Sequence, residues 1–119
     1  MKNINKIKIS LKYSLLDALK LMDNLGCKLL IVMNDNKFLS VLSIGDIQRA
    51  IISKIPLDSN IKKILRKDFS IASDKDSIDE IKKQMLDLRI ECMPVVDQDN
   101  NLIDVYFWED FFSETNNSI

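Results

Sequence analysis

The stretch Ser14-Leu15-Leu16-Asp17 has a counterpart, Ser77-Ile78-Asp79-Glu80, that begins 63 residues further along the chain. In both stretches a serine stands three positions before an acid. This is the capping-box pattern of a helix start, where the two side chains satisfy amides that the first turn leaves unpaired. Apolar residues follow each stretch at steps of three and four, the spacing of an amphipathic helix. The sequence therefore predicts two matching helices in a duplicated chain.

Two apolar runs and a further helix follow the first of these helices. Gly26 is typical of a helix end, and the continuous apolar run at 29–33 is too short for a helix, which favours a buried strand. Polar residues at 34–37 indicate a turn, and 38–42 is predicted to form a second strand. Helical spacing then resumes near Gly45 and stops before a proline at position 56.

The second half of the chain repeats this order of elements. Beyond the helices, an offset of 64 places Leu30-Ile31-Val32 on Pro94-Val95-Val96 and Asp46 on Asp110, if one residue is inserted before the strands. An internal duplication of about 60 residues explains the match, because one βαββα unit exposes apolar surface that a second can cover.

The predicted fold class is α+β, with two βαββα repeats packed in pseudo-two-fold fashion as one module. We expect repeat 1 over residues 1–58, a linker helix at 59–68 that Ser59 can cap, repeat 2 over 69–112, and a polar C-terminal tail at 113–119.

Composition excludes several classes of protein. The chain has 119 residues, 46% of them apolar and 29% charged, as in a folded domain. No apolar run approaches the roughly 20 residues that cross a bilayer, so we expect a cytoplasmic protein with no membrane partner. The absence of histidine removes the usual general base and the commonest metal ligand. Cys27 and Cys92 are expected to be buried and reduced, the alternatives being a disulfide or a reactive thiol, and neither catalysis nor a metal site is expected.

The net charge of −1 conceals two halves of opposite sign. Residues 1–64 carry eleven Lys and Arg against five Asp and Glu, whereas residues 65–119 carry six against thirteen. Five of the eight aromatic residues lie at 106–112, in the acidic half, which disfavours nucleic-acid binding. These aromatics are interpreted either as core filling or as an exposed patch for a partner.

The order of these elements resembles that of the CBS domain, and two such domains in tandem form a CBS pair, or Bateman module. The resemblance covers roughly residues 7–112 and rests on Met85, on Met93-Pro94-Val95-Val96-Asp97 and on Ser43-Ile44-Gly45-Asp46. The stretch 42–50, followed by 56–58 and 61–64, is further similar to the CBS pair that precedes the catalytic domain in bacterial sugar-phosphate nucleotidyltransferases. This likeness implies a regulatory module, itself not an enzyme, that acts on an attached or partner nucleotidyltransferase. CBS modules commonly pair, so a homodimer is also implied.

CBS pairs bind adenosine nucleotides in clefts between their two units, and the resemblance implies such a regulatory ligand here, with no other cofactor. A carboxylate accepts both hydroxyls of a ribose, and a helix start offers amides to a phosphate. The implied ribose and phosphate site is Ser43, Ile44, Gly45 and Asp46, with Arg49 as a further phosphate contact; the implied base pocket is Ile9, Lys28, Leu29 and Leu30. The alternative for Ser43 and Asp46 is a purely structural role as helix caps.

The second copy departs further from this pattern. Phe107 replaces the hydroxyl residue, and Asp104 stands at a position where the family has glycine, so only Asp110 remains of the ribose and phosphate set. We therefore expect an empty or plugged second cleft. In the first copy the departures are milder, with Ser43 for the usual threonine and Ser40 for the usual glycine. The resemblance implies AMP, ADP or ATP binding in the first cleft; the alternative is a ligand-free structural dimerisation or interaction module.

Overall fold

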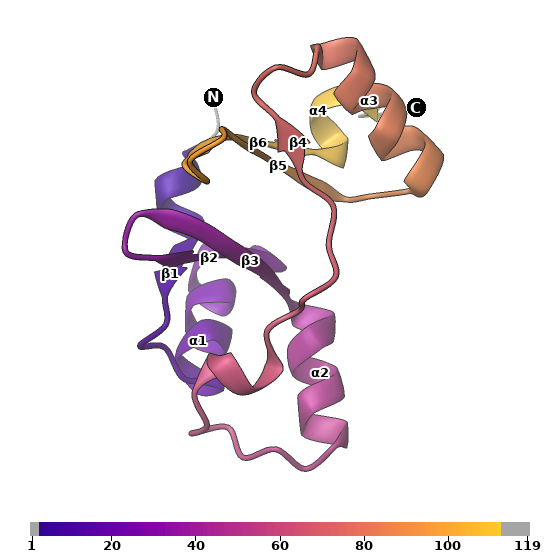
Figure 1. Cartoon of the computed structure of the whole chain (residues 1–119). Coiled ribbons are helices and arrows are strands. Elements are labelled where there is room, and N and C mark those ends of the chain that lie inside the picture. The colour runs from indigo at the N-terminus through magenta and orange to yellow at the C-terminus, as the bar shows by residue number, and fades with distance from the viewer. Residues whose placement is uncertain (1–2, 113–119) are drawn as a thin grey trace. The chain divides into compact units, whose positions relative to one another are not determined.

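The computed structural model describes residues 3–112 and divides the chain into two compact units, unit 1 (Met1–Phe69) and unit 2 (Ser70–Ile119) (Figure 1). Unit 1 contains, in order, the 3-10 helix η1 (Ile4–Ile7), β1 (Lys8–Ser10), α1 (Leu15–Leu25), β2 (Leu29–Asn34), β3 (Lys37–Ser43), α2 (Ile44–Ile52) and the 3-10 helix η2 (Ile61–Ile64). Unit 2 contains β4 (Ala72–Ser73), α3 (Ile78–Leu88), β5 (Cys92–Val96), β6 (Leu102–Phe107) and α4 (Trp108–Phe112). The predicted βαββα order is confirmed in both units.

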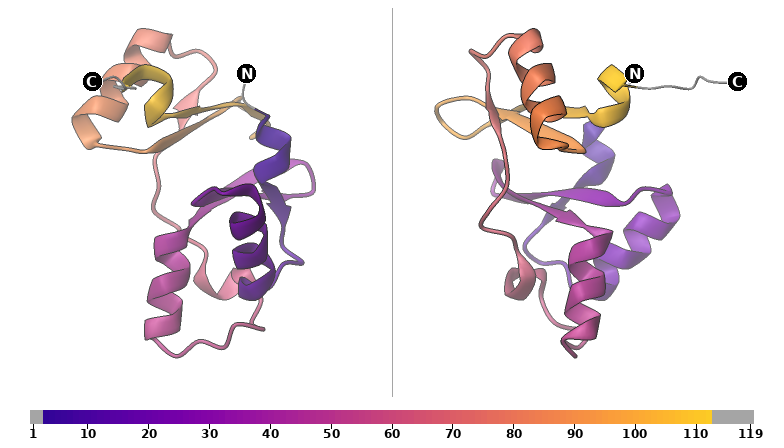
Figure 2. Two further views of the ribbon diagram at one scale, coloured as in Figure 1. Left: turned by 180° about the vertical axis from the view of Figure 1, so that it is seen from behind. Right: turned by 90° about the vertical axis from the view of Figure 1, so that its right-hand side faces the viewer.

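Each unit is a three-stranded sheet with its α-helices on one face (Figures 1 and 2). The middle strand, β2 or β5, pairs in parallel with the short strand before it and antiparallel with the strand after it.

No helix within residues 3–112 is long and apolar enough to cross a membrane. One buried apolar cluster in unit 1 consists of Ile9, Leu15, Ala18, Met22, Leu30, Val32, Leu42, Ile47, Ala50 and Ile61, and one in unit 2 of Ala72, Ile81, Met85, Met93 and Val95.

Capping boxes begin the first helix of each unit, as predicted. In α1 the Asp17 amide donates to Ser14 Oγ at 3.0 Å, and the Ser14 amide donates to the Asp17 carboxylate at 3.0 Å. In α3 the equivalent bonds between Ser77 and Glu80 measure 3.1 and 2.8 Å. Because these local bonds depend on four consecutive residues alone, the helix starts could be predicted from the sequence.

The register of the sheets corrects the alignment of the two copies. Leu30 pairs with Leu42 in unit 1, and Met93 pairs with Tyr106 in unit 2. Leu30 therefore corresponds to Met93, and its predicted match to Pro94 is wrong by one residue. A one-residue shift would turn every side chain of the strand to the opposite face, whereas Leu30 and Met93 both lie in the core on the helix side.

The inserted residue lies instead in the turn between the two antiparallel strands. In unit 1 the turn consists of Asp35 and Asn36, both in the left-handed region with φ of 50° and 69°, which is the type I′ pattern of a two-residue hairpin. In unit 2 three residues, 98–100, connect Asp97 to Asn101, and Asn100 takes the left-handed conformation with φ of 65°. The two hairpins thus differ in loop length and agree in strand register.

The segment predicted as a linker helix at 59–68 forms only the single 3-10 turn η2. Its N-cap is Asn60, not Ser59, because the Asn60 side chain accepts the Lys62 amide at 2.8 Å. Ser59 is engaged elsewhere, since its carbonyl accepts the Leu15 amide at 2.9 Å. Ile61 is fully buried in the core of unit 1, so this turn belongs to that unit. The predicted tail at 113–119 lies outside the described residues.

The cysteines match their prediction in part. Cys92 is buried, as expected, whereas Cys27, which follows the end of α1, is only half-buried. No disulfide joins them. The thiol of Cys27 therefore contributes less to the core than its apolar neighbours do.

The ends of α1 and α3 give a first prediction, because Gly26 and Arg89 occupy the same left-handed position, with φ of 66° and 55°. Left-handed backbone costs a residue with a side chain about 1 kcal/mol and costs glycine almost nothing. Arg89→Gly should therefore raise the free energy of unfolding by about 0.5–1 kcal/mol, and Gly26→Ala should lower it by about 1 kcal/mol. Urea unfolding of both variants measures this; two changes of the same sign would contradict it.

Candidate functional site

The start of α2 in unit 1 holds a polar network around one carboxylate. Ser43, the last residue of β3, caps the helix: the Asp46 amide donates to Ser43 Oγ at 3.2 Å, and the Ser43 amide donates to Asp46 Oδ2 at 2.8 Å. This capping box follows from the sequence, as in α1. Asp17 in α1 is exposed, whereas only 7% of the Asp46 side chain is exposed to solvent.

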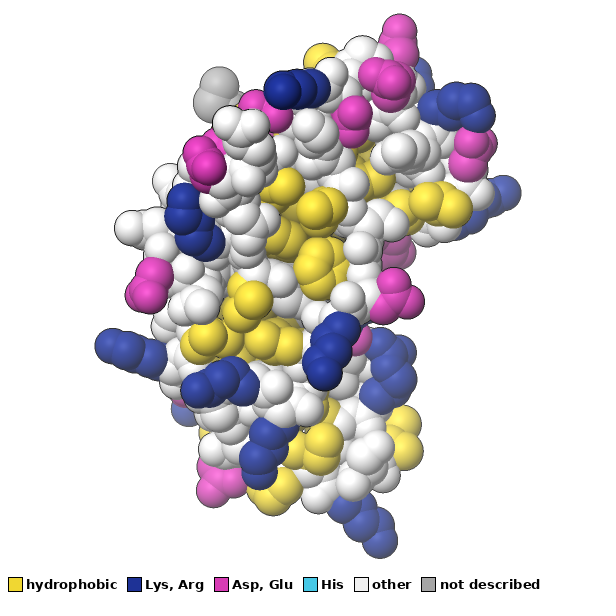
Figure 3. All heavy atoms as spheres, in the orientation of Figure 1, with side chains coloured by type: hydrophobic (Ala, Val, Ile, Leu, Met, Phe, Trp, Pro, Cys, Tyr) yellow, Lys and Arg dark blue, Asp and Glu magenta, His cyan; other side chains and the backbone are white. Residues whose placement is uncertain are grey.

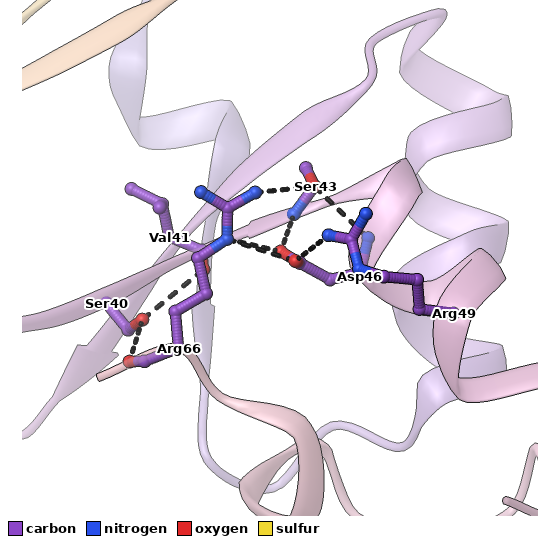
Figure 4. A network of polar contacts seen from close by, with 6 residues as sticks. All are labelled: Ser40, Val41, Ser43, Asp46, Arg49 and Arg66. Atoms are coloured by element: carbon purple, nitrogen blue, oxygen red, sulfur yellow. Dashed lines mark hydrogen bonds and ion pairs between the residues drawn. The ribbon is translucent and has the colours of Figure 1, made fainter. Parts of the chain in front are cut away.

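Two arginines contact the same carboxylate (Figure 4). Arg49, one turn along α2, donates to Asp46 Oδ1 at 2.7 Å. Arg66, which follows η2, donates through Nε to both carboxylate oxygens at 3.0 Å and through Nη2 to Ser43 Oγ at 3.1 Å. The side chains of Arg49 and Arg66 are 67% and 37% exposed, so both reach solvent while the carboxylate between them is covered.

Each Asp46 oxygen therefore accepts two contacts, which fills the four acceptor positions of a carboxylate. Burial alone raises the pKa of Asp46, but the hydrogen bonds from the Ser43 amide, from Arg66 and from Arg49 outweigh it and hold that pKa below its ordinary value of 3.8. Asp46 is thus an anion at neutral pH, and a ribose can reach it only by displacing a guanidinium.

The amides at the start of α2 are less available to a phosphate than the sequence suggested. The Ser43 and Asp46 amides serve the capping box, and the Ile44 amide donates to the Lys28 carbonyl at 2.9 Å. The hydrogen bonds of the described residues include none donated by the Gly45 amide. A Cβ built on Gly45 would lie 3.4 Å from Arg49 Nη1, so the Arg49 guanidinium lies over this glycine.

Arg66 was not among the predicted site residues. It lies 20 residues beyond Asp46, in a stretch with no motif, so only the fold brings the two together. Ser40 helps to hold it there, because its hydroxyl, 1% exposed, donates to the Arg66 carbonyl at 3.1 Å. The serine found where the resemblance expects glycine thus anchors the segment that delivers Arg66.

The residues predicted for a base pocket do not form one group in unit 1. The side chains of Ile9 and Leu30 lie inside the core on the helix side of the sheet. Leu29 is half-buried and Lys28 is exposed. Ser43, Asp46 and Arg49 lie together at the start of α2, whereas their role as a ligand site and the base pocket both remain predictions.

The equivalent place in unit 2 has different chemistry. The Phe107 amide donates to the Asp110 carboxylate at 2.7 Å, which preserves half of a capping box without a hydroxyl. Asp104 accepts the Val105 amide at 2.7 Å. Burial raises the pKa of Tyr106, and the neighbouring Asp104 carboxylate, hydrogen-bonded to the tyrosine, raises it further. Carboxylates at these positions disfavour a phosphate.

The aromatic residues at the end of unit 2 pack largely against its core. Tyr106 stacks on Phe111 with ring centroids 5.2 Å apart, and both contact the buried cluster. Trp108 lies 4.2 Å from Phe112, centroid to centroid, and Lys82 lies over the Phe112 ring. Core filling therefore accounts for much of this cluster, although none of the α4 residues is fully buried.

Charge divides between the two units. Unit 1 carries thirteen Lys and Arg against six Asp and Glu, and unit 2 carries four against twelve. On the face shown in Figure 3, Lys and Arg side chains gather over unit 1 and most Asp and Glu side chains over unit 2. Electrostatic attraction for an anion is therefore stronger at unit 1.

Residues 3–112 contain no group of acidic or cysteine side chains able to hold a metal ion.

Comparison with protein families gives one result for both copies. The family model of the CBS domain matches residues 2–53 and again residues 61–114, which together make up most of the chain. No curated protein matches the sequence.

Solved structures with the same fold have low sequence identity to this chain. A CBS domain protein from Pyrobaculum aerophilum, complexed with AMP, is 16% identical with a TM-score of 0.76, and the match covers 97% of this chain and 93% of that one. The CBS domains of a transcriptional regulator from Streptococcus pneumoniae are 16% identical with a TM-score of 0.77, covering 95% and 92%. The CBS domain pair of protein MJ0100, in complex with 5′-methylthioadenosine and S-adenosyl-L-methionine, is 20% identical with a TM-score of 0.72, covering 87% and 82%. At this identity the likeness establishes the fold.

The network at α2 predicts a stability difference between two aspartates with the same capping role. Asp46→Asn removes the charge that two arginines contact and should lower the free energy of unfolding by about 1–2 kcal/mol. Asp17→Asn, the matched control in α1, removes an exposed cap and should cost less. Chemical unfolding of both variants measures the difference, and an equal loss would show that the arginines add nothing.

Acidification should reveal the same ion pairs. Because the pKa of Asp46 is lower in the folded chain than in the unfolded one, its contribution to stability is complete above about pH 5 and is lost as the pH falls through the folded value. The gap in unfolding free energy between wild type and Asp46→Asn should hold from about pH 7 to 5 and then narrow below about pH 4. A gap that widens on acidification would contradict this assignment.

Proposed function

The chain belongs to the CBS domain family, and from this membership we propose that its first copy is a regulatory site for an adenine nucleotide, AMP, ADP or ATP. The role is binding and signalling, without catalysis by this chain. The observation that carries the proposal is the network at the start of α2, which joins a buried carboxylate to two partly exposed guanidiniums.

The chemistry of this network fits a nucleoside phosphate. Asp46 is ionised and is the acceptor that a ribose diol requires. Arg49 and Arg66 are cations with fork-shaped donors, which suit the oxygens of a phosphate. The excess of positive charge on unit 1 adds long-range attraction for an anion.

Relatives of the same fold support the choice of adenine nucleotides. One was solved with AMP and another with 5′-methylthioadenosine and S-adenosyl-L-methionine, and adenosine is the part that these ligands share. The second copy, with Phe107 in place of a hydroxyl and with Asp104 and Asp110 beside it, is proposed not to bind the ligand.

The target of the regulation is proposed from the sequence around α2. The stretch 42–50 resembles CBS pairs attached to sugar-phosphate nucleotidyltransferases, so we propose that the chain modulates such an enzyme, as an attached domain or as a partner. The opposite charges of the two copies suit a homodimer in which the basic half of one chain contacts the acidic half of another.

Calorimetric titration of the whole chain tests the nucleotide site directly. AMP, ADP and ATP should bind with dissociation constants below about 1 mM, and CMP and GTP should bind more weakly because the adenine is recognised. Asp46→Asn should weaken AMP binding at least about tenfold through loss of the ribose acceptor.

Asp17→Asn is the matched control, since it makes the same change in the other capping box of unit 1. It should bind AMP like wild type. If wild type binds none of the adenine nucleotides below millimolar concentration, or if Asp46→Asn binds as well as wild type, the proposed site is wrong.

A ligand-free structural module is the second candidate, and one observation favours it. Asp46 has all four acceptor positions filled by the chain itself, so the network is complete without a ligand. This candidate predicts a stable dimer in light scattering and no rise in melting temperature with any of the five nucleotides. A nucleotide-dependent rise in melting temperature would rule it out.

A further inference from the structure

We propose that Arg66 is a built-in competitor for the ribose position of Asp46, so that the first copy binds phosphorylated nucleosides more tightly than nucleosides that lack a phosphate. This inference rests on the proposed nucleotide site and names the residue that sets its selectivity. It starts from two contacts, those of Arg66 Nε with the two carboxylate oxygens at 3.0 Å each.

The competition follows from the geometry of the carboxylate. A ribose diol binds a carboxylate through two hydroxyl donors, one to each oxygen, and Arg66 Nε already donates to both oxygens. A charge-assisted bond from a guanidinium is stronger than a bond from a neutral hydroxyl. An uncharged ligand such as adenosine would have to replace the stronger donor by the weaker one, which disfavours its binding.

A phosphate changes this balance because it offers the guanidinium another acceptor. The Nη2 of Arg66 donates to Ser43 Oγ, but the side chain is 37% exposed, so an anion from solvent can reach part of it. When the guanidinium donates to a phosphate, the positive charge keeps an anionic partner, and Asp46 becomes available to the ribose. Arg49, which is 67% exposed, keeps its contact with Asp46 Oδ1 in this exchange.

Ser40 acts as the positioning residue for the competitor. Its buried hydroxyl donates to the Arg66 carbonyl at 3.1 Å, so this bond fixes the backbone at Arg66 to β3 and leaves the guanidinium to its own contacts. Glycine at position 40 would remove this anchor without touching Asp46 or either guanidinium. Ser40→Gly therefore changes how firmly Arg66 is held in place without changing its charge.

The experiment compares AMP with adenosine by calorimetry on the whole chain. In wild type, AMP should bind and adenosine should bind more weakly. Arg66→Gln should lower the ratio of AMP affinity to adenosine affinity by roughly tenfold or more, because AMP loses a cationic contact and adenosine no longer meets a competitor. Ser40→Gly should tighten adenosine binding with little loss of AMP binding.

Lys67→Gln is the control, because it removes one positive charge from the neighbouring exposed residue and should leave the ratio unchanged. Melting temperatures confirm that each variant is folded. If Arg66 has a purely structural role, Arg66→Gln should weaken AMP binding and adenosine binding equally. That result would overturn the inference about Arg66 and leave the proposed nucleotide site unaffected.

The remaining outcomes separate the inference from the proposed function. If wild type binds neither ligand but Arg66→Gln or Ser40→Gly binds adenosine, the competitor is supported and the native nucleotide site is wrong. If wild type and both variants bind neither ligand, both proposals are wrong.

Discussion

The contact between Asp46 and the arginines connects parts of unit 1 that are far apart in the sequence. The Asp46 carboxylate closes the capping box of α2, contacts Arg49 on the same helix and contacts Arg66 beyond η2. A buried carboxylate requires such partners, because removal from water without them would favour its neutral form. One acid therefore contributes both to the start of α2 and to the placement of the chain after η2.

Features that depend on neighbouring residues were predictable from the sequence. The capping boxes of α1 and α3 need only a serine and an acid three positions later, and Gly26 needs only its own conformational freedom to end α1. The alternation of helix and strand followed from the spacing of apolar residues. The duplication then gave the βαββα order of each unit.

Features that depend on the fold were not predictable in the same way. Arg66 reaches Asp46 across 20 residues, and nothing in its local sequence distinguishes it from neighbouring cations such as Lys67. The role of Ser40 was equally hidden, since a serine in a strand carries no pattern that points to a distant carbonyl. Almost all of the fold could thus be predicted from the sequence, whereas only the part of the candidate site that lies in α2 could be.

The two hairpin turns explain how the copies changed in length while they kept one plan. A residue added within β2 or β5 would reverse the faces of the remaining strand and place polar side chains in the core. The same residue added between Asp35 and Asn36, or at 98–100, leaves every paired residue facing as before. Hairpin turns are therefore the places where evolution can lengthen one half of a duplicated gene without rebuilding the core of either half.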